Sequence, residues 1–364
     1  MKVLVDAMCA EFGGIRTYVE HLLATWPDLH PEDELHVLVP TGSSLPTPGQ
    51  VRHEVEVPSP AEVGRPFVQT RALRRLTQEL RPDAALLTLP STTVLRLGVP
   101  SVVTVYDLRH VLRPEQFSRK QRLLRKVSYG RGYAVADEVV AISQRSLDDL
   151  HRVHPRTRRT PSRVTYLGAD HVLAWPEAGE RTHALAFGHH SNKNLDLVLD
   201  SWRTLVDDGI DVPALLILGV GKARRDEVGA MVSQRGLDAH VTLAPFLDDD
   251  EFQRTMASSS VIVFPTDFEG FGLPVPEAMT LGIPVVIGPE AATVEVAGGH
   301  AHVAGAFTAP AVAEAVRAAL AATPEQLEAA RVRGGEFTWA RTVESTRSAL
   351  EDARRRVGGA PAAR

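Results

Sequence analysis

The sequence predicts an α/β protein made of two doubly wound, parallel-sheet domains. Short apolar runs alternate with helical stretches along most of the 364 residues, a rhythm typical of parallel strands covered by helices. The segment 173–182 interrupts this rhythm, because it carries proline, glycine and charge without any period. A chain of this length is long for one core and sufficient for two. We therefore expect one such domain on each side of a linker.

The first domain is expected over residues 1–172. Its predicted strands lie at 3–5, 35–39, 84–87, 101–106, 136–142 and 164–167. Its predicted helices lie at 15–25 and 66–80, over the basic residues 119–131, and from a Ser143 cap onward. Ligands of such sheets bind at the carboxyl ends of the strands. Tyr106 and Asp107 occupy one of these ends and are therefore candidate binding residues.

The second domain is expected over residues 183–338. Its predicted strands lie at 184–187, 215–218, 241–246, 261–264 and 284–287. Its predicted helices lie at 195–206, after Asp248 and from Pro274, where the fixed φ of proline suits a first helical turn. A final helix is expected over 339–357, and residues 358–364 are expected to be disordered.

Composition excludes several classes of protein. With 44% hydrophobic and 23% charged residues the chain is an ordinary globular protein, and a net charge of −5 argues against nucleic acid as its main partner. Its single cysteine, Cys9, permits no disulfide within the chain, so a reducing, cytoplasmic compartment is the simplest expectation. The chain starts without a signal-peptide pattern, and no apolar run reaches the eighteen residues of a membrane span.

The strongest motif follows the apolar run 261–264. Two carboxylates, Glu269 and Glu277, lie eight residues apart, with Gly270 and Gly272 between them. Glycines allow a backbone to approach a ligand closely, and the start of a helix presents unpaired N–H groups. The stretch therefore predicts the floor of a pocket for a polar, partly anionic ligand.

This stretch, with Ala278, Met279 and the run 282–286, resembles the E-x7-E signature of retaining GT-B glycosyltransferases, in particular of family four. The resemblance implies two Rossmann-like domains facing across a cleft, with the final helix crossing back to the first domain. It implies transfer of a sugar from a UDP- or GDP-linked donor to an acceptor hydroxyl, with retention of configuration and with no metal or other cofactor.

The resemblance also implies roles for single residues. Glu269 would orient the transferred sugar and Glu277 would hold the ribose diol. Lys193 and the backbone of Gly270, Phe271, Gly272 and Leu273 would stabilise the departing diphosphate. Asp107 is expected to join Glu269 and Lys193 as a catalytic residue. Further donor contacts are expected from Gly13 and Gly14, from His189 and from Phe246, which would stack on the base or pack within the protein.

Two positions depart from the family pattern. Tyr106 stands where a sugar-contacting histidine is common, although a phenol still donates one hydrogen bond. His189, with His190 as an alternative, stands where an arginine is usual, and a neutral histidine donates one hydrogen bond instead of a bidentate pair. This substitution is expected to weaken phosphate binding or to make it depend on pH.

Other charged clusters have simpler interpretations. The basic stretch from Arg109 to Arg131 fits a phosphorylated acceptor or peripheral contact with an anionic membrane, but we favour a solvated helix face, because Leu123, Leu124 and Val127 suit core packing. The acidic run 248–250 fits the first turn of a helix better than a metal site. The His189-His190 pair lacks a matching carboxylate or thiol and is weak as a metal site.

A glycosyltransferase acting on a small soluble natural product or a saccharide is therefore the leading hypothesis. A nucleotide-sugar epimerase of the same fold and a non-catalytic sugar-nucleotide-binding protein are the alternatives. The sequence leaves the donor base, the sugar, the acceptor and the oligomeric state open.

Overall fold

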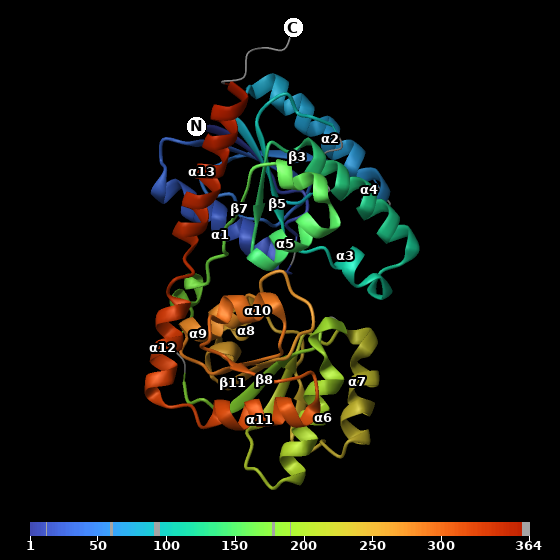
Figure 1. Ribbon diagram of the computed structural model, residues 1–364, viewed down its shortest axis with the longest axis vertical. Helices are drawn as coiled ribbons and strands as arrows, with labels where there is room; N and C mark the ends of the chain where they lie inside the picture. Colours follow the sequence, from blue (N-terminus) through green and yellow to red (C-terminus); the bar gives the residue numbers. More distant parts are fainter. Residues whose placement is uncertain (12, 59–60, 91–94, 177–178, 190, 359–364) are drawn as a thin grey trace. The chain divides into compact units, whose positions relative to one another are not determined.

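The computed structural model describes residues 1–364 except 12, 59–60, 91–94, 177–178, 190 and 359–364 (Figure 1). Its contacts divide the chain into two compact units. Met1–Gly168 and Thr338–Arg364 form the first unit, and Ala169–Phe337 form the second. The sequence-based domain limits fall at residues 172 and 338. The difference at the first limit involves the short 3-10 helix Asp170–Ala174, whose residues contact a helix of the second unit.

The first unit is built on a seven-stranded sheet in which every pairing is parallel, as predicted. The strand order is β3-β2-β1-β4-β5-β6-β7. The strands are β1 (Lys2–Asp6), β2 (Glu34–Pro40), β3 (Val51–Val55), β4 (Ala84–Leu87), β5 (Ser101–Val105), β6 (Glu138–Ala141) and β7 (Ser162–Val164). The sequence analysis missed β3, because the three central residues of this half-buried edge strand, at 52–54, are all polar, so it carries no apolar run.

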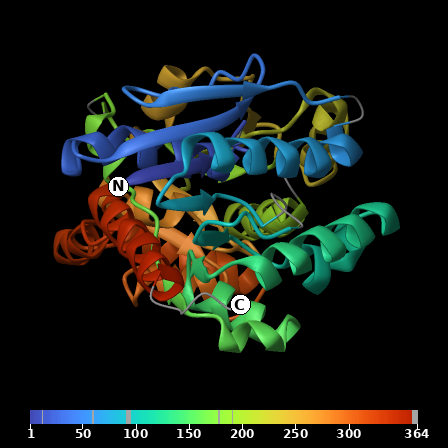
Figure 2. The same ribbon diagram turned by 90° about the horizontal axis from the view of Figure 1, so that it is seen from above.

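Helices cover both faces of this sheet (Figure 2). They are α1 (Gly13–Leu29), α2 (Ala61–Leu80), α3 (Arg109–Leu112), α4 (Arg119–Val135), α5 (Gln144–Val153) and α13 (Trp339–Gly358). Ser143 caps α5 by accepting a hydrogen bond from the Ser146 N–H, as predicted. The disordered tail was expected at 358–364, but Gly358 ends α13, and residues 359–364 lie outside the described residues.

The last helix returns to the first unit, which confirms the predicted crossover. α13 packs against α1 and against β4, β5 and β6. At its start the Trp339 ring stacks on His21 with centroids 5.0 Å apart. Gly168 allows this approach, since a Cβ there would lie 2.4 Å from the Trp339 nitrogen. Trp339 therefore anchors the helix where the chain re-enters the first unit.

The second unit contains a six-stranded parallel sheet with the order β10-β9-β8-β11-β12-β13. The strands are β8 (His183–Phe187), β9 (Ala214–Leu218), β10 (Val241–Leu243), β11 (Ser259–Phe264), β12 (Val285–Ile287) and β13 (His302–Val303). The helices are α6 (Leu195–Asp207), α7 (Lys222–Gln234), α8 (Asp249–Ala257), α9 (Pro274–Thr280), α10 (Ala291–Ala297), α11 (Ala309–Leu320) and α12 (Pro324–Gly334). β8 and β11 are neighbours at the centre of this sheet, so the loops that follow them meet at its carboxyl edge.

A buried carboxyl group ends β1 in the first unit. Asp6 is 1% exposed and accepts hydrogen bonds from the Met8 N–H and from Gln69 Nε2. Burial raises its pKa to about 7, although these hydrogen bonds and the Arg65 charge act in the opposite direction. A carboxyl group whose pKa is higher in the folded state than in the unfolded state lowers the stability of the fold as pH rises. For Asp6 this loss occurs between the pKa of the unfolded state, near 4, and the pKa of the folded state, about 7.

Asp6→Asn is expected to remove this pH dependence, because the amide does not ionise. Between pH 5 and pH 8 the free energy of unfolding of the wild type should fall by about 2–3 kcal/mol more than that of the variant. Urea denaturation of both proteins at the two pH values measures this difference. Parallel pH profiles would show that Asp6 does not titrate in this range.

Candidate active site

The loops after β8 and β11 bring together two residues that the sequence analysis placed in one site. Lys193 ends the 3-10 helix Ser191–Lys193, and Glu269 lies in the loop between β11 and α9. Lys193 Nζ donates to Glu269 Oε1 over 2.6 Å, and the Lys193 side chain is only 8% exposed. The ammonium group also lies over the Phe264 ring, 4.3 Å from its centroid. The pair is thus a partly desolvated charge pair at the carboxyl edge of the sheet.

Two further polar residues hold the same carboxylate oxygen. Asn192 Nδ2 lies 3.0 Å and Thr266 Oγ1 lies 2.9 Å from Glu269 Oε1. Both residues are buried, and Asn192 also joins the two loops, since its Nδ2 donates to the Phe268 carbonyl over 2.9 Å. Sequence reasoning missed them, because a lone Asn and a lone Thr form no recognisable motif. The available signal was their nearness in sequence, since Asn192 precedes Lys193 and Thr266 lies three residues before Glu269.

A left-handed residue completes the junction of the two loops. Asn194 has φ +51°, a conformation in which asparagine is enriched, and its Nδ2 donates to the Pro265 carbonyl over 2.9 Å. The Asp267 N–H donates to the Asn192 carbonyl over 3.1 Å. Backbone and side-chain bonds therefore fix the position of Glu269 relative to Lys193, which favours a preorganised site.

The second carboxylate of the motif has a different partner. Glu277 lies one turn into α9, and its Oε1 is 3.4 Å from His171 Nε2. Both side chains are 9% exposed. The Trp175 ring meets the edge of the His171 ring at a centroid distance of 5.6 Å. His171 was not expected in the site, because it lies far from Glu277 along the sequence and belongs to no motif.

The glycine-rich part of the motif is tightly packed. Gly272 has φ +84°, and a Cβ there would lie 2.9 Å from Thr293 Cγ2, so only glycine fits. The Phe271 ring is buried and packs edge-on against Phe337 at 5.7 Å. Phe271 therefore contributes to the core through its side chain.

The loops after β8 and β9 are also adjacent. His189 is exposed, and its Cβ lies 3.0 Å from the place of a Cβ on Gly219, which has φ +77°. His190 lies outside the described residues. Phe246, in the loop after β10, is 95% exposed and does not belong to the core.

The remaining predicted contacts belong to the first unit. Gly13 and Gly14 are exposed and begin α1, two residues before the predicted start of that helix. Asp107 accepts a hydrogen bond from the Arg109 N–H over 2.8 Å. The Tyr106 hydroxyl is buried without a hydrogen-bond partner among the described residues, and burial raises its pKa well above the usual value. Its ring meets Tyr18 edge-on at 5.9 Å.

One prediction about α4 is wrong. Leu123, Leu124 and Val127 do not pack in the core but are 65%, 38% and 62% exposed. Instead, α4 is buried mainly near its C-terminal end, at Gly132, Tyr133 and Val135. The helix therefore presents both its basic and its apolar residues to solvent.

Among the described residues, the grouped potential metal ligands do not include Glu269. Asp248 caps α8 in a capping box with Glu251, which confirms the helix-start interpretation of the acidic run. Among the described residues, one group of potential ligands, His30, Glu32 and Asp33, lies within coordinating range, and it belongs to the first unit. Burial would raise the pKa of Asp33, but hydrogen bonds from Arg347, the N-terminus and Trp26 lower it to about 2. Asp33 thus already has cationic partners.

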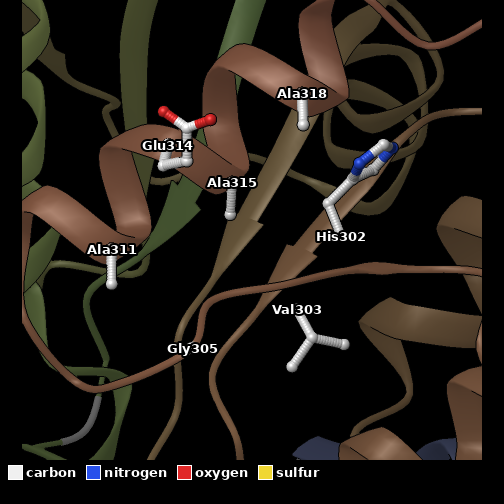
Figure 3. A pocket seen from close by; sticks show the side chains of 7 residues that line it. All are labelled: His302, Val303, Gly305, Ala311, Glu314, Ala315 and Ala318. Carbon is white, nitrogen blue, oxygen red and sulfur yellow. The ribbon is translucent and has the colours of Figure 1, made fainter.

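A surface hollow between β13 and α11 is separate from these groups (Figure 3). Its lining is formed by His302, Val303, Gly305, Ala311, Glu314, Ala315 and Ala318. Most of these side chains are short and apolar, and none of the residues around Glu269 takes part. The hollow offers no cluster of reactive groups.

Solved structures with a similar fold include two that match nearly the whole chain. Sucrose-phosphate synthase from Thermosynechococcus elongatus has a TM-score of 0.76 at 15% identity, covering 99% of this chain and 100% of its own. Anabaena HepE, in complex with UDP and glucose, has a TM-score of 0.73 at 15% identity, covering 97% and 100%. The two Rossmann-like sheets and these likenesses define a protein with the GT-B fold of glycosyltransferases.

Two family models specify the class further. The model of glycosyl transferases group 1 matches residues 180–331, and the model of glycosyltransferase family 4 matches residues 12–172. Together the two models cover most of both units. The chain belongs to the GT-B glycosyltransferases of the family 4 type.

Curated relatives match a part of the chain. O-antigen chain mannosyltransferase B of Escherichia coli is 28% identical over 143 residues, which are 38% of this chain and 36% of the relative. Alpha-D-kanosaminyltransferase of Streptomyces kanamyceticus is 24% identical over 205 residues, which are 52% of this chain and 53% of the relative. The matches thus span from about a third to about half of the length of these relatives.

In the part of the chain that the structure describes, no helix combines the length and the apolar character needed to cross a bilayer.

Proposed function

We propose that this protein transfers a glycosyl group from a nucleoside diphosphate sugar to an acceptor hydroxyl. The observation that carries the proposal is the Lys193–Glu269 pair, held by Asn192 and Thr266 at the carboxyl edge of the second sheet. A fixed ammonium group beside a fixed carboxylate matches a donor in which an anionic diphosphate is attached to a hydroxyl-rich sugar. Family membership and the UDP complexes of HepE support a nucleotide-sugar donor.

In this proposal the second unit holds the donor. Lys193 has three N–H donors, of which one serves Glu269, and the others bind the departing diphosphate. Glu269 accepts hydrogen bonds from sugar hydroxyls. Glu277, beside His171, accepts the two ribose hydroxyls, as the acidic residue of dinucleotide-binding folds does.

We further propose that transfer proceeds with retention and without a metal. The difficult step is departure of the diphosphate from a carbon that becomes oxocarbenium-like. A cation fixed in a partly desolvated site stabilises that leaving charge without reorganisation at the moment of reaction. Lys193 meets this requirement, since its side chain is 8% exposed and its loop is bound to the Glu269 loop.

The acceptor in this proposal is a small natural product or a saccharide, and the protein acts in the cytoplasm. The kanosaminyltransferase and the mannosyltransferase among its relatives are named for transfer of sugars, which supports this class of reaction. The first unit supplies the acceptor side, as the sequence resemblance implies, with Asp107 and Tyr106 at the carboxyl end of β5.

Ligand-induced stabilisation tests the donor. The melting temperature of the purified protein should rise with UDP, GDP or ADP in a concentration-dependent way, and the responding nucleotide identifies the base. Adenosine monophosphate and inorganic diphosphate, each of which contains part of a nucleoside diphosphate, are measured for comparison. A protein whose melting temperature responds to no nucleoside diphosphate would contradict the proposed donor site.

Phe246→Ala should weaken nucleoside diphosphate binding about 5- to 150-fold if the ring stacks on the base, since a base–aromatic stack is worth roughly 1–3 kcal/mol. Stability of the unliganded protein should not change, because the ring is 95% exposed. Calorimetry measures the affinity. Phe67→Ala, which removes a ring that is 73% exposed in the first unit, is the matched control. Equal affinity of wild type and Phe246→Ala would remove Phe246 from the donor site.

A further inference from the structure

The exposed surface of α4 carries a compact apolar stripe. Leu123 and Val127 are one helical turn apart and therefore lie on the same face, and Leu124 lies beside them. Their exposed fractions of 65%, 62% and 38% leave most of this apolar area in water. Single exposed apolar residues are common, but neighbouring ones on one helix indicate contact with a partner.

Basic residues surround this stripe. Arg119 and Lys120 precede Leu123 by four and three residues, and Lys126 follows it by three. These residues and Arg122 are exposed. The sequence from residue 116 to residue 136 contains no acidic residue, although the whole chain has a net charge of −5. The face is therefore both locally cationic and apolar.

The fold presents this face without needing it for packing. A capping box of Ser118 and Gln121 begins α4. Near its other end, Gly132 lies so close to Pro90 that a Cβ would be 2.0 Å from the Pro90 carbonyl oxygen, and the Tyr133 ring is buried. The helix is thus anchored at its C-terminal end, and its N-terminal part reaches the edge of the first unit in both views (Figures 1 and 2).

We propose that this face of α4 docks on the surface of an anionic lipid bilayer. Leu123 and Val127 would insert at the boundary between headgroups and acyl chains, while Arg119, Lys120 and Lys126 would contact lipid phosphates. The apolar stripe distinguishes a bilayer from a nucleic acid, whose phosphate backbone offers nothing to leucine or valine. A second copy of the same face would be repelled, because both faces are cationic. The surface is independent of the proposed chemistry around Glu269.

Vesicle sedimentation tests this proposal with the full chain. The protein should sediment with vesicles of phosphatidylcholine containing 30% phosphatidylglycerol and not with phosphatidylcholine alone, and binding should weaken as salt rises. Lys120→Gln with Lys126→Gln should lower the partition coefficient about 25-fold, at roughly fivefold for each charge. Leu123→Gln with Val127→Gln should lower it by at least about tenfold.

Matched controls separate the face from general surface effects. Val332→Gln removes a valine that is 65% exposed on α12, where Arg331 and Arg333 are paired with Glu328 and Glu336, and it should bind vesicles like the wild type. Unchanged melting temperatures of the α4 variants, with and without UDP, show that fold and donor site are intact. Equal binding of wild type and the α4 variants would overturn the proposal. So would a dimer in light scattering that the Leu123 and Val127 changes dissociate, without any vesicle binding by the wild type.

Discussion

Glu269→Gln is expected to lower the rate of sugar transfer by roughly 100- to 1000-fold, the loss typical of removing one preorganised electrostatic contact. Glutamine keeps the shape of the side chain but loses its charge and presents an N–H donor in place of one oxygen. Lys193, Asn192 and Thr266 all direct donors toward Glu269 Oε1, so the amide cannot satisfy them without turning its own oxygen inward. The measurement is the turnover number with the identified donor and acceptor.

Glu314→Gln is the matched control for this change. Its carboxylate belongs to the same unit, on α11, but is 74% exposed and pairs with Arg317 at the surface. It should retain wild-type turnover and stability. If Glu269→Gln kept near-normal turnover in a folded preparation, Glu269 would not orient the sugar.

Lys193→Ala is expected to weaken binding of the nucleoside diphosphate about 10- to 150-fold, the range of roughly 1.5–3 kcal/mol for hydrogen bonds to charged groups. Turnover should fall further, because the diphosphate gains charge as it departs. Lys193→Arg should recover part of the affinity, since it keeps the charge in a different shape. Isothermal calorimetry with the diphosphate alone separates binding from catalysis.

Lys222→Ala provides the control for charge in the second unit. Lys222 is exposed at the start of α7, which follows β9, and β8 separates β9 from β11 in the sheet. Because salt screens exposed charges, its removal should change the affinity for the nucleoside diphosphate less than twofold. Calorimetric affinities that are equal for wild type and Lys193→Ala would contradict the phosphate role of Lys193.

Much of the fold was predictable because parallel sheets leave a regular pattern. Buried strands such as 84–87 and 184–187 read as apolar runs, and Ser143, Asp248 and Pro274 mark helix starts through local chemistry. The edge strand β3 was missed, because an edge strand with one exposed face needs no apolar run. Local signals thus predict the central strands and fail at the margin of the sheet.

The site was predictable where one segment carries several of its residues. Glu269 and Glu277 share one motif, and Lys193 was assigned because the loop after β8 resembles the phosphate-binding loop of the family. Asn192, Thr266 and His171 were not found, because their roles arise when separate loops meet in space. The exposure of Leu123 and Val127 was also missed, since an apolar residue in a helix predicts burial unless the packing partner is known.

Release of nucleoside diphosphate from sugar donors tests the central claim most directly. With a panel of UDP-, GDP- and ADP-sugars, the account predicts that one donor releases its diphosphate, that a hydroxyl acceptor accelerates the release, and that Glu269→Gln abolishes the acceleration. A product whose anomeric configuration equals that of the donor would support retention. Conversion of the donor sugar without any release would instead indicate an epimerase, and binding without either reaction would indicate a non-catalytic protein; each result would contradict the proposed transfer.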